Sequence, residues 1–529
     1  MSMDCGEEIP VSTVDPKLGP TELFHEVATG TGLGTAGSLV DRRFVTAALM
    51  LVMVLASMEQ TVTSTAMPTI IGKLKGIEHY SWVASIYLLA CTISMPIYGR
   101  LADTLGRRIV ILCAIGVFAT GSLLASSAQT MTQLIIFRGI QGLGAGGIMP
   151  VVLTILGDIY TLEERARVQG LFSAVWGTSS LAGPALGALL VRTLGWRSIF
   201  YVNLPFGLLG MIALIWKYRD RGDKHSTDID LPGAISLGLL CMSLLLLVGD
   251  VAPAGAGFWW PLSLGLAAAI AGIYFVRHER RTANPILPPN FLTHPVIGTS
   301  LMGSMLMGIC FLSLDTFVPL YVQGGRGGGA IGSASVVTPV MLTWALSGIV
   351  AAPMVVHLGF RRTATFGTLM ITTGFTGLLL AAIFSFSPWM LTAVLAITGF
   401  GFGPTSMSYL LSAQETVEWK QRGLVTSNVM FMRTAGGALG IGALGGLFTR
   451  LISSNLAATP QQLLDPSLRK QIPQHMLAAS QLVVCHALLW VFLAMLAAAV
   501  MGILVTRRIP ARKAARRPLA MHAAEAMAG

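Results

Sequence analysis

Charge is what this 529-residue sequence has least of. Asp, Glu, Lys and Arg make up 11% of the residues and hydrophobic residues 53%, whereas a soluble domain carries roughly 25% charged residues. So few charges cannot cover the surface of a soluble protein of this length. The composition therefore excludes a soluble multidomain enzyme and predicts an integral membrane protein.

The patterns that mark metal sites, redox sites and nucleotide-driven pumps are also missing. The six cysteines show no CxxC spacing, and the nine histidines form no HxH or HExxH pair, so we expect no disulfide framework, no metal site and no cofactor. No GxxxxGK[ST] loop occurs, which argues against a built-in ATPase. The Gly-rich run at 324–329 has no strand before it and is interpreted as a flexible loop.

What the sequence does contain is a series of long apolar runs. Because a bilayer core requires about 20 apolar residues per helix, these runs predict an all-α, polytopic membrane protein. The fourteen predicted spans are 44–64, 80–99, 109–128, 134–156, 168–190, 198–217, 232–249, 259–276, 297–320, 334–356, 364–383, 389–411, 424–448 and 484–505.

The basic residues orient these spans. With a cytoplasmic N-terminus, 24 Lys and Arg fall in the inside segments and 8 in the outside segments, which is a clear positive-inside bias. We therefore expect a multi-pass protein of the inner or plasma membrane with both termini in the cytoplasm. The net charge of +11 then faces anionic lipid rather than nucleic acid.

The spans fall into two similar sets. Two six-helix bundles are expected at 44–217 and 297–505, separated by a linker, 218–296, that carries two extra central spans. Residues 1–43 and 506–529 would be cytoplasmic tails, the second of them basic. Two helical repeats are typical of a secondary transporter whose substrate path runs between the halves.

The turn after the second span carries the most specific motif, GRLADTLGRR at 99–108. It resembles the signature of the major facilitator superfamily at each fixed position. The resemblance implies a conformational gate formed by Gly99, Asp103, Gly106, Arg107 and Arg108, in which Asp103 and the two arginines lock the cytoplasmic helix ends in the outward-open state. The alternative is a charged turn that only sets topology.

Two further motifs narrow the resemblance. The fifth span carries GTSSLAGPALG, which resembles the antiporter signature of the superfamily through Gly177, Gly183, Pro184 and Gly187; ordinary small-residue packing is the alternative. The runs MEQTVTSTAMP at 58–68 and WRSIFYVNLPFG at 196–207 are similar to signatures of the 14-span drug:proton antiporters. In the first run Glu59 stands where that family usually has Asp.

Four charged residues lie inside predicted spans: Glu59, Arg138, Asp315 and Arg433. A charge in a bilayer is costly unless paired, solvated or protonated. Arg138 begins RGIQGLG, which resembles a superfamily motif whose Arg tunes a proton-carrying carboxylate, so Glu59, Arg138 and Asp315 are the candidates for proton coupling. A structural ion pair for the first two, and a water-facing role for Asp315, remain open.

Other polar residues of the spans are candidates for the substrate path, with helix packing as the alternative for Arg433. They are Gln60, Gln141, Asn428 and Arg433.

The resemblance implies that the protein exports lipophilic, cationic drugs in exchange for protons by alternating access, and that it is not an enzyme. The expected partners are a small lipophilic substrate, protons and membrane lipid, with a periplasmic adaptor if the organism is Gram-negative. Two alternatives stay open: an exporter of a specific metabolite or lipid with the same fold, and a sensor or scaffold that no longer transports.

Overall fold

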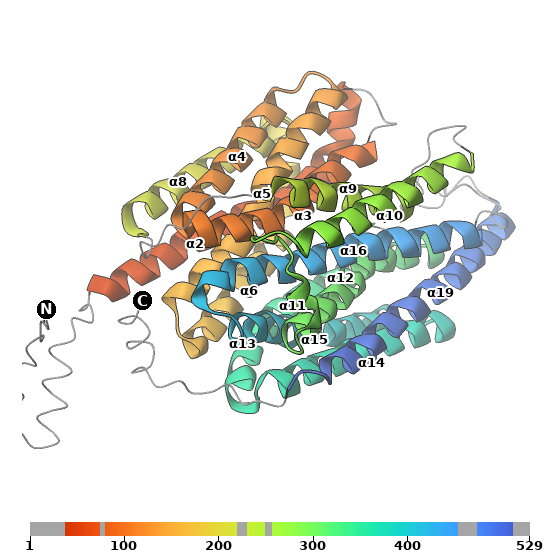
Figure 1. Cartoon of the computed structure of the whole chain (residues 1–529). Helices are drawn as coiled ribbons and strands as arrows, with labels where there is room; N and C mark the ends of the chain where they lie inside the picture. Colours follow the sequence, from red (N-terminus) through yellow and green to blue (C-terminus); the bar gives the residue numbers. More distant parts are fainter. Residues whose placement is uncertain are drawn as a thin grey trace, which may run out of the picture.

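The computed structural model describes residues 37–74, 80–219, 230–248, 257–328, 330–452 and 473–510. Most of the two predicted tails, 1–43 and 506–529, lies outside these ranges. So does most of the loop before the last predicted span. The described chain is almost entirely helical (Figure 1). Its first eight helical elements are α2 (Gly37–Leu74), α3 (Tyr80–Leu105), α4 (Arg107–Ser127), α5 (Met131–Ile159), α6 (Leu162–Leu194), α7 (Ser198–Tyr201), α8 (Asn203–Lys217) and α9 (Leu231–Val248). The remainder are α10 (Trp259–Glu279), α11 (Pro289–Thr293), α12 (Ile297–Leu320), η2 (Tyr321–Gly325), α13 (Ala330–Leu358), α14 (Phe360–Phe384), α15 (Pro388–Gln414), η3 (Trp419–Gln421), α16 (Arg422–Ile452) and α19 (Gln474–Thr506).

Within the described ranges, thirteen helical stretches are long and apolar enough to cross a membrane. The remaining predicted span, 168–190, falls within α6, which is 33 residues long but rich in glycine, serine and threonine. Only its end, Ala185–Leu194, counts as an apolar helix, and a short one. The structure confirms the prediction of an all-α polytopic membrane fold.

The helices form two groups with a hairpin beside them. In Figure 1 the red-to-yellow helices α2 to α8 lie together, and so do the green-to-blue helices α12 to α19, whereas α9 runs beside α16 and α10 packs on α9. We call the first group the N-half and the second the C-half. They meet where α3 packs on α16 and α6 packs on α13, and α9 contacts both α3 and α16. Two pairs of helices therefore form most of the interface between the halves, and α5 also contacts α16.

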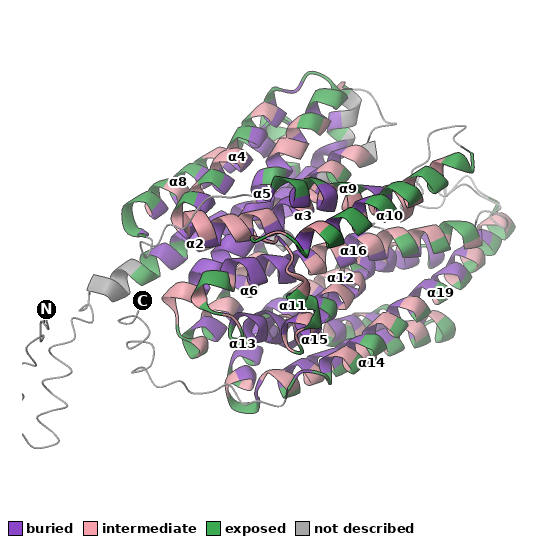
Figure 2. Cartoon of the chain, viewed as in Figure 1, coloured by how far each residue is buried: buried purple, intermediate pink, exposed green. Residues whose placement is uncertain are grey.

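Burial follows this arrangement. In α5 the most apolar window is 78% buried, whereas in α10 only 17% is buried, so α5 is central and α10 peripheral (Figure 2). Large apolar side chains such as Trp216, Leu266 and Leu504 are exposed. A row of exposed apolar side chains on a helix with no charge beside it is the surface expected to contact lipid.

Helix ends are stabilised locally where the chain turns. Thr130 and Ser387 cap α5 and α15 by accepting a hydrogen bond from a backbone N–H of the first turn. Thr161 and Glu164 form a capping box at the start of α6, which satisfies donors that the helix leaves free. Both described chain ends lie at the end of the bundle where α3 ends and α4 begins, which we call the Asp103 end (Figure 1).

Candidate functional site

At the Asp103 end a carboxylate of the N-half binds the first turn of a C-half helix. Asp103, near the end of α3, accepts hydrogen bonds from the backbone N–H groups of Gly423 at 3.0 Å and Leu424 at 2.7 Å. These two groups lie at the start of α16, where the backbone donors have no partner inside the helix and the helix dipole favours a negative charge. The contact joins residues more than 300 positions apart and closes this end of the interface.

Arg107 reinforces the same closure. Its guanidinium lies 3.0 Å from the Asp103 carboxylate and 3.0 Å from that of Asp158 on α5. It also donates to the Trp419 carbonyl at 3.0 Å and lies 3.9 Å from the centre of the Trp419 ring. One buried cation therefore links α3 and α5 of the N-half to η3 of the C-half by charge, hydrogen bond and cation–π contact.

The structure divides the Arg107–Arg108 pair that the motif placed together in the gate. The Arg108 guanidinium donates to the Ile215 carbonyl of α8, within its own half. Successive residues on a helix point about 100° apart, so the two arginines leave the helix in different directions. Of the two, Arg107 is the one that bridges the halves in the contacts described here.

Gly99 and Gly106 of the motif are each required for a different geometric reason. Gly106, between α3 and α4, has φ 95°, a region that residues with a Cβ rarely adopt. At Gly99 a Cβ would lie 1.8 Å from Ser427 Oγ and 2.6 Å from the Gly423 carbonyl oxygen. Gly99 therefore allows α3 to approach α16 closely enough for Asp103 to reach its partners.

A second set of contacts closes the same end without any residue from the motif. Arg165 at the start of α6 forms an ion pair of 3.0 Å with Glu415, and it donates to the Gly157 carbonyl at 2.7 Å. Arg422 of α16 donates to the same carbonyl at 3.0 Å. Arg165 and Arg422 therefore add contacts between the halves at the Asp103 end that do not involve Asp103.

Glu59 lies inside the N-half and is 2% exposed. Arg138 of α5 and Asn203 of α8 donate to its two carboxylate oxygens, and the Thr63 hydroxyl donates at 2.9 Å. Three helices of one half thus satisfy a carboxylate that would be very costly to bury alone.

Further polar groups extend this cluster away from Glu59. The Gln141 carbonyl oxygen accepts from Arg138 at 2.7 Å, and its amide nitrogen donates to Ser122 at 3.3 Å. Ser122 also accepts from Asn203 at 2.9 Å, and the Arg138 guanidinium lies 4.1 Å from the Tyr87 ring centre. We call these residues with Glu59 and Thr63 the Glu59 cluster. Among them, the roles of Ser122, Tyr87 and Asn203 were not predicted, because only the fold reveals which neutral side chains meet a given charge.

The glycine motif of α6 lies beside this cluster and beside the C-half. A Cβ at Gly183 would lie 1.9 Å from Thr61 Oγ1 of α2, and one at Gly187 would lie 3.1 Å from the Val62 carbonyl. One at Gly177 would lie 3.0 Å from the Ala345 Cβ of α13. The side chain of Pro184 lies outside the described residues. The motif thus packs α6 tightly on α2 next to Glu59 and on α13 across the interface.

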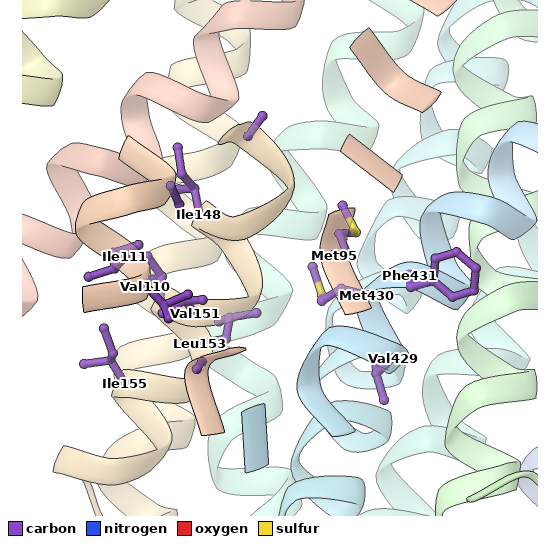
Figure 3. Packing of buried hydrophobic residues seen from close by; sticks show 14 of the residues in the cluster. Met95, Val110, Ile111, Ile148, Val151, Leu153, Ile155, Val429, Met430 and Phe431 are labelled. Atoms are coloured by element: carbon purple, nitrogen blue, oxygen red, sulfur yellow. The ribbon is translucent and has the colours of Figure 1, made fainter. Parts of the chain in front are cut away.

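Between the halves lies a cavity of about 80 Å³. Residues from α2, α5 and α6 line it on one side and residues from α12, α13, α15 and α16 on the other; Figure 3 labels Leu153 of the first set and Val429 and Met430 of the second. The lining consists of Met53, Met149, Leu153, Gln169, Phe172, Ser173, Trp176, Ser304, Met307, Met341, Trp344, Ala345, Ser406, Leu410, Val429, Met430 and Arg433. Arg433 is the one charged residue in this lining.

The structure separates the other candidates for the substrate path. Gln141 belongs to the Glu59 cluster, and the Asn428 amide donates to the Ile286 carbonyl in the linker at 3.0 Å, so neither lines the cavity. The side chain of Gln60 lies outside the described residues. Asp315 is exposed and does not line the cavity, although it shares one face of α12 with Ser304, which does. Of the four candidates, the cavity contains Arg433.

Comparisons with known proteins agree with this architecture. Residues 49–441 match the model of the Major Facilitator Superfamily. The chain is 34% identical over 413 residues to the multidrug transporter protein MdtP of Bacillus subtilis (strain 168), covering 78% of this chain and 76% of that protein. It is 30% identical over 475 residues to multidrug resistance protein 3 of the same strain, covering 84% of this chain and 90% of the relative.

Among solved structures, the fold resembles that of the human organic anion transporter MFSD10, with a TM-score of 0.60 at 14% identity over 88% of this chain and 99% of that one. At this identity the likeness concerns the fold alone. The family match covers well over half of the chain and includes the N-half from residue 49, most of the C-half and the turn at 99–108. The chain belongs to the major facilitator superfamily and is a multi-pass membrane transporter of that family.

Proposed function

We propose that this transporter exports lipophilic compounds in exchange for protons, with Glu59 as the proton carrier and with the Asp103 end facing the cytoplasm. The observation that carries the proposal is the Glu59 cluster: a carboxylate on a membrane-spanning helix, paired with Arg138 and buried next to the interface helix α6. Intramembrane carboxylates of this kind are typical of proton relays. The names of the two Bacillus relatives support drug export as the physiological direction.

The cluster contains what a proton exchange requires. When a proton binds a Glu59 carboxylate oxygen, the Arg138 guanidinium loses its counter-charge and needs another acceptor. The Gln141 oxygen, 2.7 Å from Arg138, holds the guanidinium in either case. Protonation therefore weakens the attachment of α2 to α5, while the Arg138 guanidinium keeps the Gln141 oxygen as an acceptor. Because α2 packs tightly on α6, this local change in α2 can be transmitted to the interface.

The gate supplies the second requirement, which is that one end closes while the other opens. The contacts of Asp103 and Arg107 with α16 and η3 exist only when the halves meet at this end. A contact made in one state shifts the equilibrium toward that state by its own free energy. In the proposed orientation this is the outward-facing side of the cycle.

The test is the transport of ethidium, and of the oppositely charged dye dansylglycine, in inverted membrane vesicles that contain the protein. We expect accumulation when the lumen is acidified and loss of the accumulated dye when nigericin collapses the pH gradient. Accumulation that survives the collapse of the gradient, with the membrane potential also removed by valinomycin and potassium, would contradict proton exchange. No transport of any lipophilic compound in a correctly inserted protein would favour the sensor or scaffold alternative.

A further inference from the structure

Arg433 occupies an unusual position in the middle of α16. Its backbone packs on α12, where a Cβ at Gly308 would lie 1.8 Å from the Arg433 carbonyl oxygen. Its side chain lines the cavity between the halves. The residue therefore presents a fixed positive charge at the place where a substrate of this fold would bind.

Within the described residues, the Arg433 side chain forms no hydrogen bond and no ion pair. Arg138, which also lies inside a membrane-length helix, has Glu59, Gln141 and the Tyr87 ring as partners. A guanidinium stays charged under all physiological conditions and carries five donors, so leaving it unpaired in a membrane interior is costly. Such a cost is recovered when a ligand supplies the missing acceptor.

No residue of the cavity lining can supply that acceptor as a carboxylate, because the lining contains no Asp or Glu. The nearest intramembrane candidate on α12 is Asp315, seven residues beyond Gly308, which is roughly 10 Å farther along the helix at 1.5 Å per residue. Glu59 is already bound by Arg138 and Asn203 within the N-half. The charge of the cavity is therefore positive, contrary to the cationic substrates expected from the sequence.

The other residues that line the cavity indicate the chemical character of the rest of a ligand. Trp176 of α6 and Trp344 of α13 face each other across the interface with ring centres 5.2 Å apart, and five methionines line the same cavity. Aromatic rings and flexible thioethers bind flat apolar groups of variable shape. The apolar part of a ligand would contact both halves, while its acceptor group would contact Arg433.

We propose that the substrates of this cavity are lipophilic monovalent organic anions, that is, an aromatic body carrying one carboxylate or sulfonate that pairs with Arg433. This rests on the proposed export function and specifies its substrate class. The present cavity of about 80 Å³ is smaller than the roughly 300 Å³ of a small-molecule site, so the halves separate around the two tryptophans when such a ligand binds.

The test uses three probes with the same fluorescent body and different charge: dansylglycine (anionic), dansylglycinamide (neutral) and dansylethylenediamine (cationic). Binding to the full-length protein in nanodiscs is followed by energy transfer from tryptophan to the dansyl group. Because the carboxylate of dansylglycine gives the Arg433 guanidinium a charged hydrogen-bond acceptor, we expect dansylglycine to bind about 10- to 100-fold more tightly than the other two probes. Equal affinities, or tighter binding of the cation, in the wild-type protein would overturn the proposal without any variant.

Four variants then locate the residue that sets the preference. Arg433→Gln should remove the preference for the anion while neutral binding persists, and Arg433→Lys should keep most of it. Arg362→Gln is the matched control, because it removes one positive charge from an exposed position at the start of α14. An equal effect of Arg433→Gln and Arg362→Gln would show that overall charge, not the cavity, selects the anion. A preference for the cationic probe in the wild-type protein that Asp315→Asn removes would restore the cationic substrate class.

This binding test is separate from the test of proton exchange. It requires no gradient, so anion binding can fail while proton-driven export of other compounds is observed. Conversely, anion-selective binding together with transport that ignores the pH gradient would overturn the proposed coupling and leave the substrate class standing.

Discussion

Replacing Asp103 by Asn should open the Asp103 end of the protein. The carboxylate accepts two backbone hydrogen bonds from Gly423 and Leu424 across the interface, and bonds to a charged group contribute about 1.5–3 kcal/mol each. An amide keeps one acceptor oxygen, so the variant loses about one such bond. The ratio of closed to open forms should fall roughly 10- to 100-fold.

The assay is a distance measurement between spin labels at Arg167→Cys on α6 and Lys420→Cys in η3, both exposed at the Asp103 end, after replacement of the native cysteines. We expect a single short distance in the otherwise unaltered protein and a second, longer population with Asp103→Asn. Substrate affinity should change little, while turnover slows. Glu163→Gln, an exposed acid on α6, is the control. An unchanged distance distribution would refute the gate assigned to Asp103.

Two further outcomes follow from the packing and the ion pair. Glu59→Gln and Arg138→Gln should each lower the free energy of unfolding in detergent by about 3–5 kcal/mol, because each leaves a buried charge unpaired. The double variant should lower it by far less than the sum of the two single variants, and additive effects would contradict a coupled pair. Gly99→Ala should open the gate as Asp103→Asn does, because the new Cβ would lie 1.8 Å from Ser427 Oγ. Gly116→Ala, whose Cβ would have 3.9 Å of clearance, is the control, and equal spin-label distances in both alanine variants would contradict this reasoning.

Much of this architecture could be predicted from the sequence, because a bilayer imposes length and apolarity on each helix. The turn at 99–108 was recognisable by its resemblance to the superfamily signature, and the structure adds the reasons for its glycines: Gly106 has φ 95°, and Gly99 lies against α16. The depth of Glu59 and Arg138 along their helices also made their contact feasible. The spans and these depths depend on periodicity and rise, which are local properties of the chain.

The features that were missed depend on tertiary contacts. Trp419 and Asp158 join the gate through Arg107, from helices far away in the sequence. Asn428 was expected near the substrate path, but its helix rotation turns it to the linker at Ile286. The isolation of Arg433 is a property of what surrounds it, and no pattern within α16 distinguishes a cavity arginine from one that holds helices together.

The central claim is that Glu59 carries the exchanged proton, and proton movement itself tests it most directly. The protein is reconstituted into liposomes that contain the pH indicator pyranine, and proton flux is recorded when ethidium or dansylglycine is added outside. Wild-type protein should move protons in the direction opposite to the substrate. Glu59→Gln should exchange labelled for unlabelled substrate but move no protons, whereas Glu59→Asp should retain part of the flux. Proton flux in Glu59→Gln equal to that of the wild type would contradict the account.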